Sequence, residues 1–401
     1  MNLDAFFDMW FHSKGYPILS IDFSFDKKKG LGSFTIKQDQ IDKEQGIEAF
    51  EFDLEVKWCD KEGAEASEKL HVSKTEQVFK VKMSEPEYVA IDPEMKALFE
   101  MTFKPGDDLL LALLEKGSTV REVMQAVTAL AKTGKRKHIK AIADHLASEE
   151  RWGVRIHCYR ELSSIGNAIA FETLSELLLT EKDPMVLEHA AQACGKHRHT
   201  SLAKALRTRL ADENLPYRGQ MALLNSLGAQ GDPADIELLR TAAQSSGWRD
   251  LIKAGAYLGL GASHLEEACE PLLDGMDDPV HFFDAKIARV MGLGSLRDWL
   301  PSEMRKRVDQ ALINATHDPS YFVKVVSART IAGAGVKAGA PSLDALFAVM
   351  PTQDHPMLKK LLSKLASAGG EKESKKLQKQ LDSLKEKLAE MEKRLQEVEP
   401  E

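Results

Sequence analysis

Apolar residues recur along the middle of the chain with the period of helices, in units of nearly constant length. In one unit, Ala170, Leu174, Leu177 and Leu178 occupy positions i, i+4, i+7 and i+8, on one face of a helix. A short break joins this helix to a second one, which closes on a Gly-containing turn. Breaks follow at an average of 32 residues between Val120 and Trp248, then at about 31, 40 and 37. The eight breaks carry Val120-Arg121, Trp152-Gly153, Asp183-Pro184, Leu215-Pro216, Gly247-Trp248, Asp278-Pro279, Asp318-Pro319 and His355-Pro356.

A fixed period in this range predicts a helical solenoid, in which no unit can bury its apolar face alone. The second helices are rich in small residues, as in Ala254-Gly-Ala-Tyr-Leu-Gly-Leu-Gly261. Small side chains let neighbouring helices approach closely. The units resemble HEAT repeats, whose second helix typically opens Asp-Pro-x-Val-Arg and ends Ala-x-x-Leu-Gly. Arg121 and Arg155 keep the Arg of that pattern, and most other units lack it.

The period changes to two between Tyr16 and Lys104. Ile18-Leu-Ser-Ile-Asp-Phe-Ser-Phe25 alternates, as does Phe50-Glu-Phe-Asp-Leu-Glu-Val-Lys-Trp58. Short alternating strands with polar turns predict an antiparallel β-sandwich. Residues 1–15 predict a short helical lead-in whose aromatic side chains need a cover, some from the domain that follows and some from a partner. The candidate partner contacts are Phe6, Phe7, Trp10 and Phe11.

After Gly369-Gly370, apolar residues follow the 4-3 spacing of a coiled coil through three heptads. Two interpretations stay open: a parallel homodimer through this helix, or an intramolecular helix lying back on the last repeats. The predicted fold is thus mainly α, with a lead-in (1–15), a β-sandwich (16–104), a HEAT-like solenoid (105–370) and a coiled-coil helix (371–401). The seam comprises Leu377, Leu381, Leu384, Leu388, Met391, Leu395 and Val398.

Composition narrows the functional classes. Hydrophobic residues make up 43% and charged residues 29%, with a net charge of −8, so neither nucleic acid nor an anionic membrane is the expected partner. No apolar segment of 18 residues exists to span a membrane, and the first residues do not read as a signal peptide. Four scattered cysteines read as buried thiols of a reducing compartment, and we expect a cytoplasmic protein.

A family resemblance lies in the N-terminal part. Phe6-Phe7-x-x-Trp10, then Gly15-Tyr-Pro17 leading into a strand and Thr35-Ile-Lys-Gln38, resembles the segment just after the catalytic domain of M1-family zinc aminopeptidases. The resemblance implies a β-sandwich followed by a helical region, which some prokaryotic members build from HEAT-like repeats ending in a charged helix. It covers essentially the whole chain through the order of its parts.

The catalytic motifs of that family are missing. The family carries Gly-x-Met-x-Asn and His-Glu-x-x-His, whose two histidines bind zinc on one helix face while the Glu activates water. Here no His is followed four residues later by another His, and Gly-x-Met-x-Asn is absent. We therefore expect no catalytic residue, no enzyme activity of the chain by itself and no cofactor, with zinc only in a catalytic domain outside this chain.

One further cluster invites a metal interpretation. Cys194, His197 and His199 lie close together, with His189 before them. A helix C-terminus, where cationic side chains meet exposed carbonyls, explains the same residues, and no second ligand pair completes a zinc shell. The helix interpretation is therefore favoured.

Two functions remain open. The first is the non-catalytic C-terminal region of an M1 aminopeptidase-like protein, which gates peptide access or docks on a zinc peptidase domain. The alternative is a stand-alone HEAT-repeat scaffold that binds a protein or peptide. Independent peptidase activity is disfavoured by the missing zinc motif.

Overall fold

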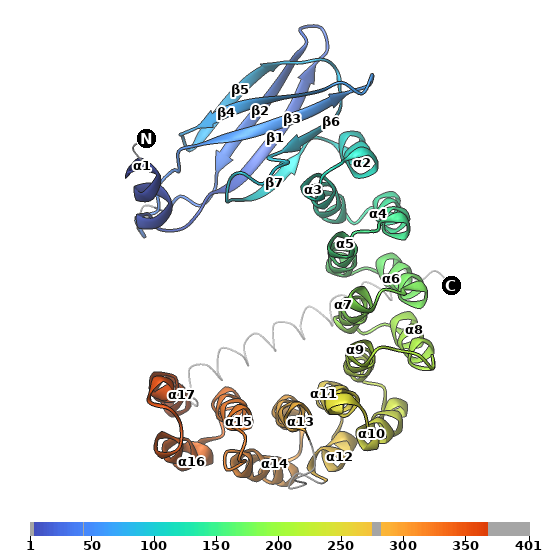
Figure 1. Ribbon diagram of the computed structural model, residues 1–401, viewed down its shortest axis with the longest axis vertical. Coiled ribbons are helices and arrows are strands. Elements are labelled where there is room, and N and C mark those ends of the chain that lie inside the picture. Colours follow the sequence, from blue (N-terminus) through green and yellow to red (C-terminus); the bar gives the residue numbers. More distant parts are fainter. Residues whose placement is uncertain (1–3, 43, 275–281, 368–401) are drawn as a thin grey trace, which may run out of the picture. The chain divides into compact units, whose positions relative to one another are not determined.

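The computed structural model describes residues 4–42, 44–274 and 282–367 (Figure 1). The chain divides into two compact units, Met1–Leu223 and Leu224–Glu401. The first unit contains the strands and the first helix pairs, and the second unit is built from helices. The coiled-coil seam and the break at Asp278-Pro279 lie outside the described residues.

Strands of the first unit form two sheets. One sheet has the order β5-β2-β1-β7 and the other β4-β3-β6. All neighbours are antiparallel except β1 and β7, which run parallel with Ile18 opposite Glu100. The expected purely antiparallel arrangement is therefore wrong at this edge, because the long connection from β1 to β7 allows both strands to run in one direction. The strands are β1 (Ile18–Asp26), β2 (Leu31–Gln38), β3 (Phe52–Asp60), β4 (Glu65–Val72), β5 (Glu76–Lys82), β6 (Pro86–Ile91) and β7 (Glu100–Lys104).

Alternation along the strands places one side chain in two inside a core that both sheets share. On β3, Leu54 and Val56 are fully buried, and on β2 Phe34 and Ile36 are too. The residues between them, such as Glu55, are more exposed. The predicted period of two is thus the period of burial.

Helices follow in pairs, and each predicted break within the described residues opens the second helix of a pair. The first unit holds α2 (Asp107–Lys116), α3 (Val120–Ala131), α4 (Arg136–Ser148), α5 (Trp152–Ile165), α6 (Ala168–Thr180), α7 (Pro184–Gly195) and α8 (Thr200–Leu210), and α9 (Tyr217–Gly228) contains the division. The second unit holds α10 (Ile236–Gln244), α11 (Leu251–Ser263), α12 (Cys269–Leu273), α13 (Phe283–Leu296), α14 (Ser302–Ala315), α15 (Tyr321–Gly333), α16 (Ala340–Ala345) and α17 (His355–Ser367).

Local sequence sets these helix ends. Thr119 caps α3 in a capping box with Glu122, whose side chain accepts the Thr119 backbone N–H. Asp183 caps α7 and Pro184 opens it, where the missing N–H of proline costs nothing. Gly166, with φ 68°, ends α5 in the left-handed conformation. These residues explain why the breaks were visible in the sequence.

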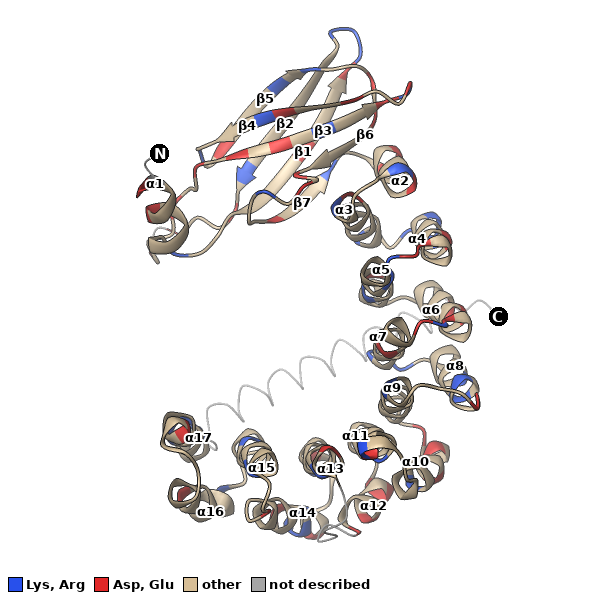
Figure 2. Cartoon of the chain, in the orientation of Figure 1, with Lys and Arg blue, Asp and Glu red and all other residues tan. Residues whose placement is uncertain are grey.

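Glycines bring the second helices of the second unit into backbone contact. A Cβ on Gly228 would collide with the backbone of Gly259, and one on Gly261 with the backbone of Gly292. Close approach of α9, α11 and α13 therefore depends on residues without side chains. The prediction that small residues set the packing of these helices is confirmed here. Both Lys or Arg and Asp or Glu occur on the helices of each unit (Figure 2).

Candidate functional site

Three phenylalanines form an exposed cluster at the start of the first unit. They lie on a short helical segment, α1 (Asp4–Phe7) and η1 (Asp8–His12). Phe6, Phe7 and Phe11 are 50%, 44% and 68% exposed. Their rings contact one another, with centroids 5.3 to 6.4 Å apart. Large apolar side chains grouped on a surface mark interaction sites, because isolated monomers rarely expose them together. We call these three residues the aromatic surface.

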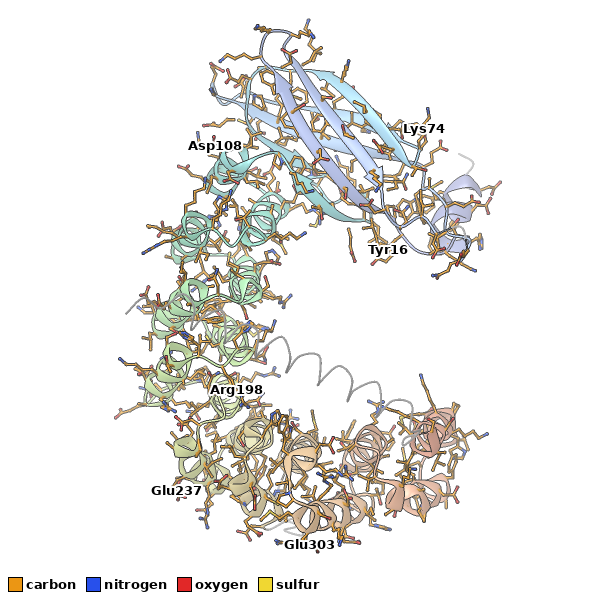
Figure 3. The ribbon with its side chains drawn as sticks, turned by 180° about the vertical axis from the view of Figure 1, so that it is seen from behind. Tyr16, Lys74, Asp108, Arg198, Glu237 and Glu303 are labelled. Atoms are coloured by element: carbon orange, nitrogen blue, oxygen red, sulfur yellow. The ribbon has the colours of Figure 1, made fainter. Side chains whose placement is uncertain are left out.

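Trp10 holds this segment on the sheets. Its ring lies 5.5 Å from Phe50 and 6.1 Å from Phe52, both buried in the core. The backbone N–H of Glu51 donates to Met9 Sδ at 3.1 Å. Thus the structure separates the four aromatics named from the sequence: Trp10 packs inward and the other three face solvent. Figure 3 shows Tyr16 on the segment that leads from η1 into β1.

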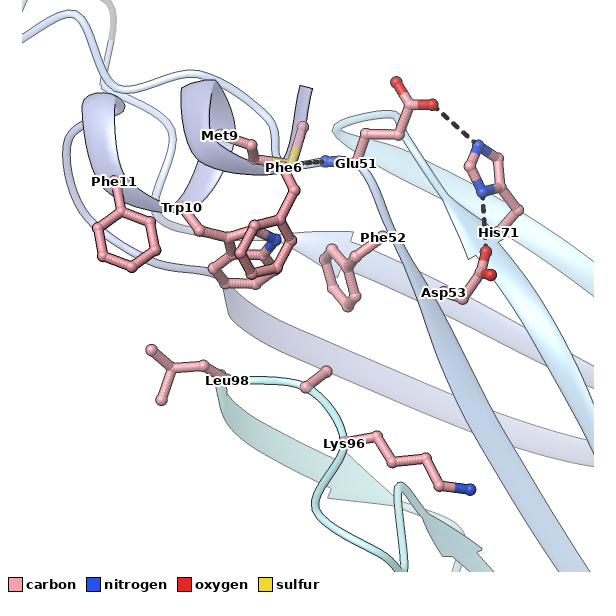
Figure 4. Close-up of a pocket in the computed structure, with 11 residues that line it drawn as sticks. Phe6, Met9, Trp10, Phe11, Glu51, Phe52, Asp53, His71, Lys96 and Leu98 are labelled. Carbon is pink, nitrogen blue, oxygen red and sulfur yellow. Dashed lines mark hydrogen bonds and ion pairs between the residues drawn. The ribbon is translucent and has the colours of Figure 1, made fainter. Parts of the chain in front are cut away.

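A cavity of about 720 Å³ adjoins the aromatic surface (Figure 4). Its apolar lining comes from both the lead-in and the sheets, and includes the exposed Leu98. Pockets of this size and lining bind ligands or partner side chains. The lining residues are Phe6, Met9, Trp10, Phe11, Glu51, Phe52, Asp53, His71, Lys96, Ala97 and Leu98.

Charged groups form the rim of this cavity. His71 Nδ1 lies 3.0 Å from Asp53 Oδ1, and Nε2 lies 3.1 Å from Glu51 Oε1. The hydrogen bond with Asp53, together with Glu51, raises the pKa of His71. Lys96 Nζ lies 2.6 Å from Glu55 Oε2, which lowers the pKa of the Glu55 carboxyl. Each cation of the rim is therefore already paired with a carboxylate.

Exposed apolar residues also recur where the second helices begin. In the first unit, Trp152 is 57% exposed at the start of α5. In the second unit, Trp248 is 55% exposed before α11, and the Arg249 guanidinium lies 5.3 Å from its ring. Neither tryptophan packs between repeats, so each is accessible to a partner. Further exposed residues at these ends are Val120, Met185 and Tyr217 in the first unit and Phe282, Tyr321 and Phe322 in the second.

The residues around Cys194 form the C-terminal end of α7 and the connection to α8. His197 Nε2 lies 2.8 Å from the Ser163 carbonyl oxygen, and His199 Nδ1 lies 2.8 Å from Ser201 Oγ. Cys194 is fully buried, and burial raises the pKa of its thiol to about 12. In the described part of the chain, no three His, Cys, Asp or Glu side chains converge as metal ligands. The residues present do not fit a zinc site there.

All four cysteines are buried, and none of them forms a disulfide with another described residue. Burial raises the pKa of Cys158 to about 12 and also raises those of Cys59 and Cys269. A thiol whose pKa is raised well above neutral pH stays protonated and is a poor nucleophile. None of the described helices is both long and apolar enough to cross a membrane.

Comparison with known proteins supports HEAT repeats in part of the helical region. A family model described as HEAT repeats matches residues 108–193 and 171–254. No curated protein matches the chain. Among solved structures, aminopeptidase A of Legionella pneumophila in complex with aspartic acid is similar at a TM-score of 0.38 and 13% identity. That match covers 91% of this chain and 50% of the other, so the chain spans half the length of that protein. A superposition this loose does not establish a shared fold.

Proposed function

We propose that this chain is a non-catalytic protein-binding scaffold whose aromatic surface docks on a partner protein or on an adjoining domain. The observation that carries the proposal is the solvent-facing cluster of Phe6, Phe7 and Phe11 on a segment that Trp10 fixes to the core. Aromatic anchors on a fixed support bind with little loss of conformational entropy. HEAT repeats, moreover, typically serve as protein-binding surfaces.

The more specific form of the proposal names the catalytic domain of an M1-type zinc aminopeptidase as the partner. Its support is the Phe6-Phe7-x-x-Trp10 motif and the order of strands followed by helical repeats. Zinc and the hydrolysis of peptide N-termini would then belong to the catalytic domain. This chain would restrict peptide access to it and would not be an enzyme by itself.

The alternative is a stand-alone scaffold. It is favoured by the exposed apolar residues that open successive second helices, such as Trp152 and Met185 in the first unit. We also propose that residues 371–401 form a homodimeric coiled coil, on the strength of their heptad spacing. Buried cysteines that form no disulfide with other described residues favour the cytoplasm.

Immunoblotting of source cells with an antibody against this chain separates the two forms. A band near twice the chain mass of 44.6 kDa favours an aminopeptidase-like protein with the catalytic domain in the same polypeptide. With a band at 44.6 kDa, a photocrosslinker placed at Phe11 tests for a separate partner. Crosslinking to a protein with His-Glu-x-x-His supports docking on a peptidase. Docking through the aromatic surface is overturned by the following pair of results. The band runs at 44.6 kDa, and a photocrosslinker at Trp152 gives a product while one at Phe11 gives none.

A further inference from the structure

A second cavity, of about 550 Å³, lies in the first unit between β7 and α3. We call it the β7–α3 groove. One wall is the whole of β7 with the residue before it, Phe99. The other wall is a single face of α3, whose residues recur at helical spacing. These are Arg121, Met124, Gln125, Thr128 and Ala129, followed by Lys132 just past the end of α3.

β7 is an edge strand on the side of this groove. It ends the four-stranded sheet, and among the described strands its one neighbour is β1. The N–H of Glu100 donates to the Pro17 carbonyl oxygen at 3.0 Å, so Glu100, Thr102 and Lys104 direct their backbone groups toward β1. Because successive residues of a strand alternate, Met101 and Phe103 direct theirs toward the open edge. An extended peptide can pair with such an edge by adding one more strand.

Arg121 supplies a cation without a carboxylate partner among the described residues. Its guanidinium lies 5.3 Å from the centroid of the Phe99 ring, and its Nε is buried with no hydrogen-bond acceptor in the described part of the chain. A buried donor left unpaired is costly, and a carboxylate bound to the guanidinium would offset that cost with charge-assisted hydrogen bonds. This atom points to an acidic ligand.

The other charged groups of the groove also favour a negatively charged ligand. Lys104 and Lys132 line it, and Lys132 Nζ lies 3.4 Å from Thr102 Oγ1. Glu100 is the one carboxylate of the lining, and it accepts a hydrogen bond from Tyr16 Oη at 2.6 Å. Burial lowers the pKa of His157, which therefore adds no positive charge near neutral pH. Three cations thus face one engaged carboxylate, in a chain whose net charge is −8.

Apolar side chains of the groove are adaptable. Met95, Met101 and Met124 line it, and unbranched thioether side chains adjust to different partners. A strand of five residues, the length of β7, spans about 16 Å. The groove therefore suits a short segment with alternating apolar and acidic residues.

We propose that the β7–α3 groove binds an acidic, extended peptide segment of a partner protein, which adds to β7 as a further strand and places a carboxylate on Arg121. This site is separate from the aromatic surface and does not depend on it. The proposal predicts two measurable properties: dependence on charge, and dependence on the peptide's own backbone N–H groups.

The test uses a fluorescent heptapeptide of alternating Glu and Val, titrated with the full chain by anisotropy. We expect saturable binding that weakens with salt, no binding of the Lys/Val counterpart, and loss of binding when alternate peptide nitrogens are methylated. Arg121→Met should weaken binding about tenfold or more, whereas Arg136→Met, on the exposed start of α4, should not change it. Met101→Pro, which removes an edge N–H, should also weaken binding.

Several results would overturn the proposal. Equal binding by the N-methylated peptide would mean a charged surface without strand addition. If glutarate displaced the heptapeptide completely at the concentrations at which the peptide itself binds, the groove would be a site for small carboxylates and not for a peptide. Equal affinity of the Arg121→Met and Arg136→Met chains, or no binding of the heptapeptide, would place acidic ligands elsewhere. Should Met101→Pro unfold the chain, the N-methylated peptide tests the same hydrogen bonds without altering the protein.

Discussion

Gln125 of α3 hydrogen-bonds both backbone groups of Ile91, the last residue of β6. The Ile91 N–H donates to Gln125 Oε1 at 3.1 Å, and Gln125 Nε2 donates to the Ile91 carbonyl oxygen. β6 ends its sheet, so the side-chain amide stands where a neighbouring strand would pair. All these atoms are buried, and the contact joins the sheets to the first repeat.

Gln125→Leu should destabilise the first unit by about 2 kcal/mol or more, because it leaves a buried N–H and a buried carbonyl unpaired. Chemical denaturation followed by circular dichroism measures the loss. Gln192→Leu, at an exposed position of α7, is the matched control and should have little effect. Equal stability of the two variants would refute the role given to Gln125.

Lys57→Met should cost about 3 kcal/mol, because Glu122 is fully buried and Lys57 Nζ lies 3.1 Å from its carboxylate. Burial alone raises the pKa of Glu122, but hydrogen bonding at Thr119 and the pair with Lys57 outweigh it, so the folded pKa is lowered. A lowered folded pKa contributes stability above the unfolded value of about 4.3 and loses it as pH falls. The wild-type chain should therefore lose stability on acidification through this range.

In Lys57→Met the burial of Glu122 remains and its cation is gone, so the variant should lose less stability between pH 6 and pH 3, on the order of half the wild-type loss. Denaturation midpoints across this pH range provide the measurement. Lys69→Met, on the exposed side of β4, serves as the control. A parallel pH profile for wild type and Lys57→Met would contradict the assignment.

Replacing Phe6, Phe7 and Phe11 with Ser should leave the unfolding free energy within about 0.5 kcal/mol of wild type, since all three side chains face solvent. Partner binding through the aromatic surface should fall at least tenfold in the same variant. Trp10→Ala should instead destabilise the first unit by about 2 kcal/mol, because its ring packs on Phe50 and Phe52. The reverse pattern of stabilities would mean that the segment is oriented differently.

Gly259→Ala should destabilise the second unit by several kcal/mol, about 3, because the added Cβ meets the carbonyl of Leu224 and the side chain of Leu239. Gly333→Ala is the matched control. It lies in α15 with no atom within 4 Å of a Cβ, so alanine should stabilise by up to about 1 kcal/mol. Thermal unfolding of the two variants gives opposite shifts if helix approach depends on Gly259.

Local sequence patterns predicted the parts of the fold that depend on neighbouring residues alone, namely the helix starts and the alternating burial along strands. Asp183-Pro184 and Thr119 mark helix starts through their own backbone preferences, and the alternation around Leu54 follows from a strand with one buried face. These features need only neighbouring residues. The sequence therefore contained them.

Long-range placement was not predictable in the same way. The parallel pairing of β7 with β1 joins residues about 80 positions apart, and nothing near Glu100 encodes it. The β7–α3 groove depends on this pairing and so was not foreseen. The inward role of Trp10 likewise depends on Phe50 and Phe52, which lie 40 residues or more away in the sequence. A run of aromatic residues indicates that some of the side chains are buried. It does not indicate which of them are.

The four buried cysteines make this chain well suited to site-specific labelling. Their raised pKa values and burial keep the native thiols unreactive toward maleimides at neutral pH. A cysteine introduced beside each surface, at the exposed Ser13 near Phe11 or at the exposed Glu94 next to Met95, would then be the group that reacts. Each proposed surface can thus carry its own fluorescent reporter in an otherwise unaltered protein, and occupancy of one can be followed while the other is free.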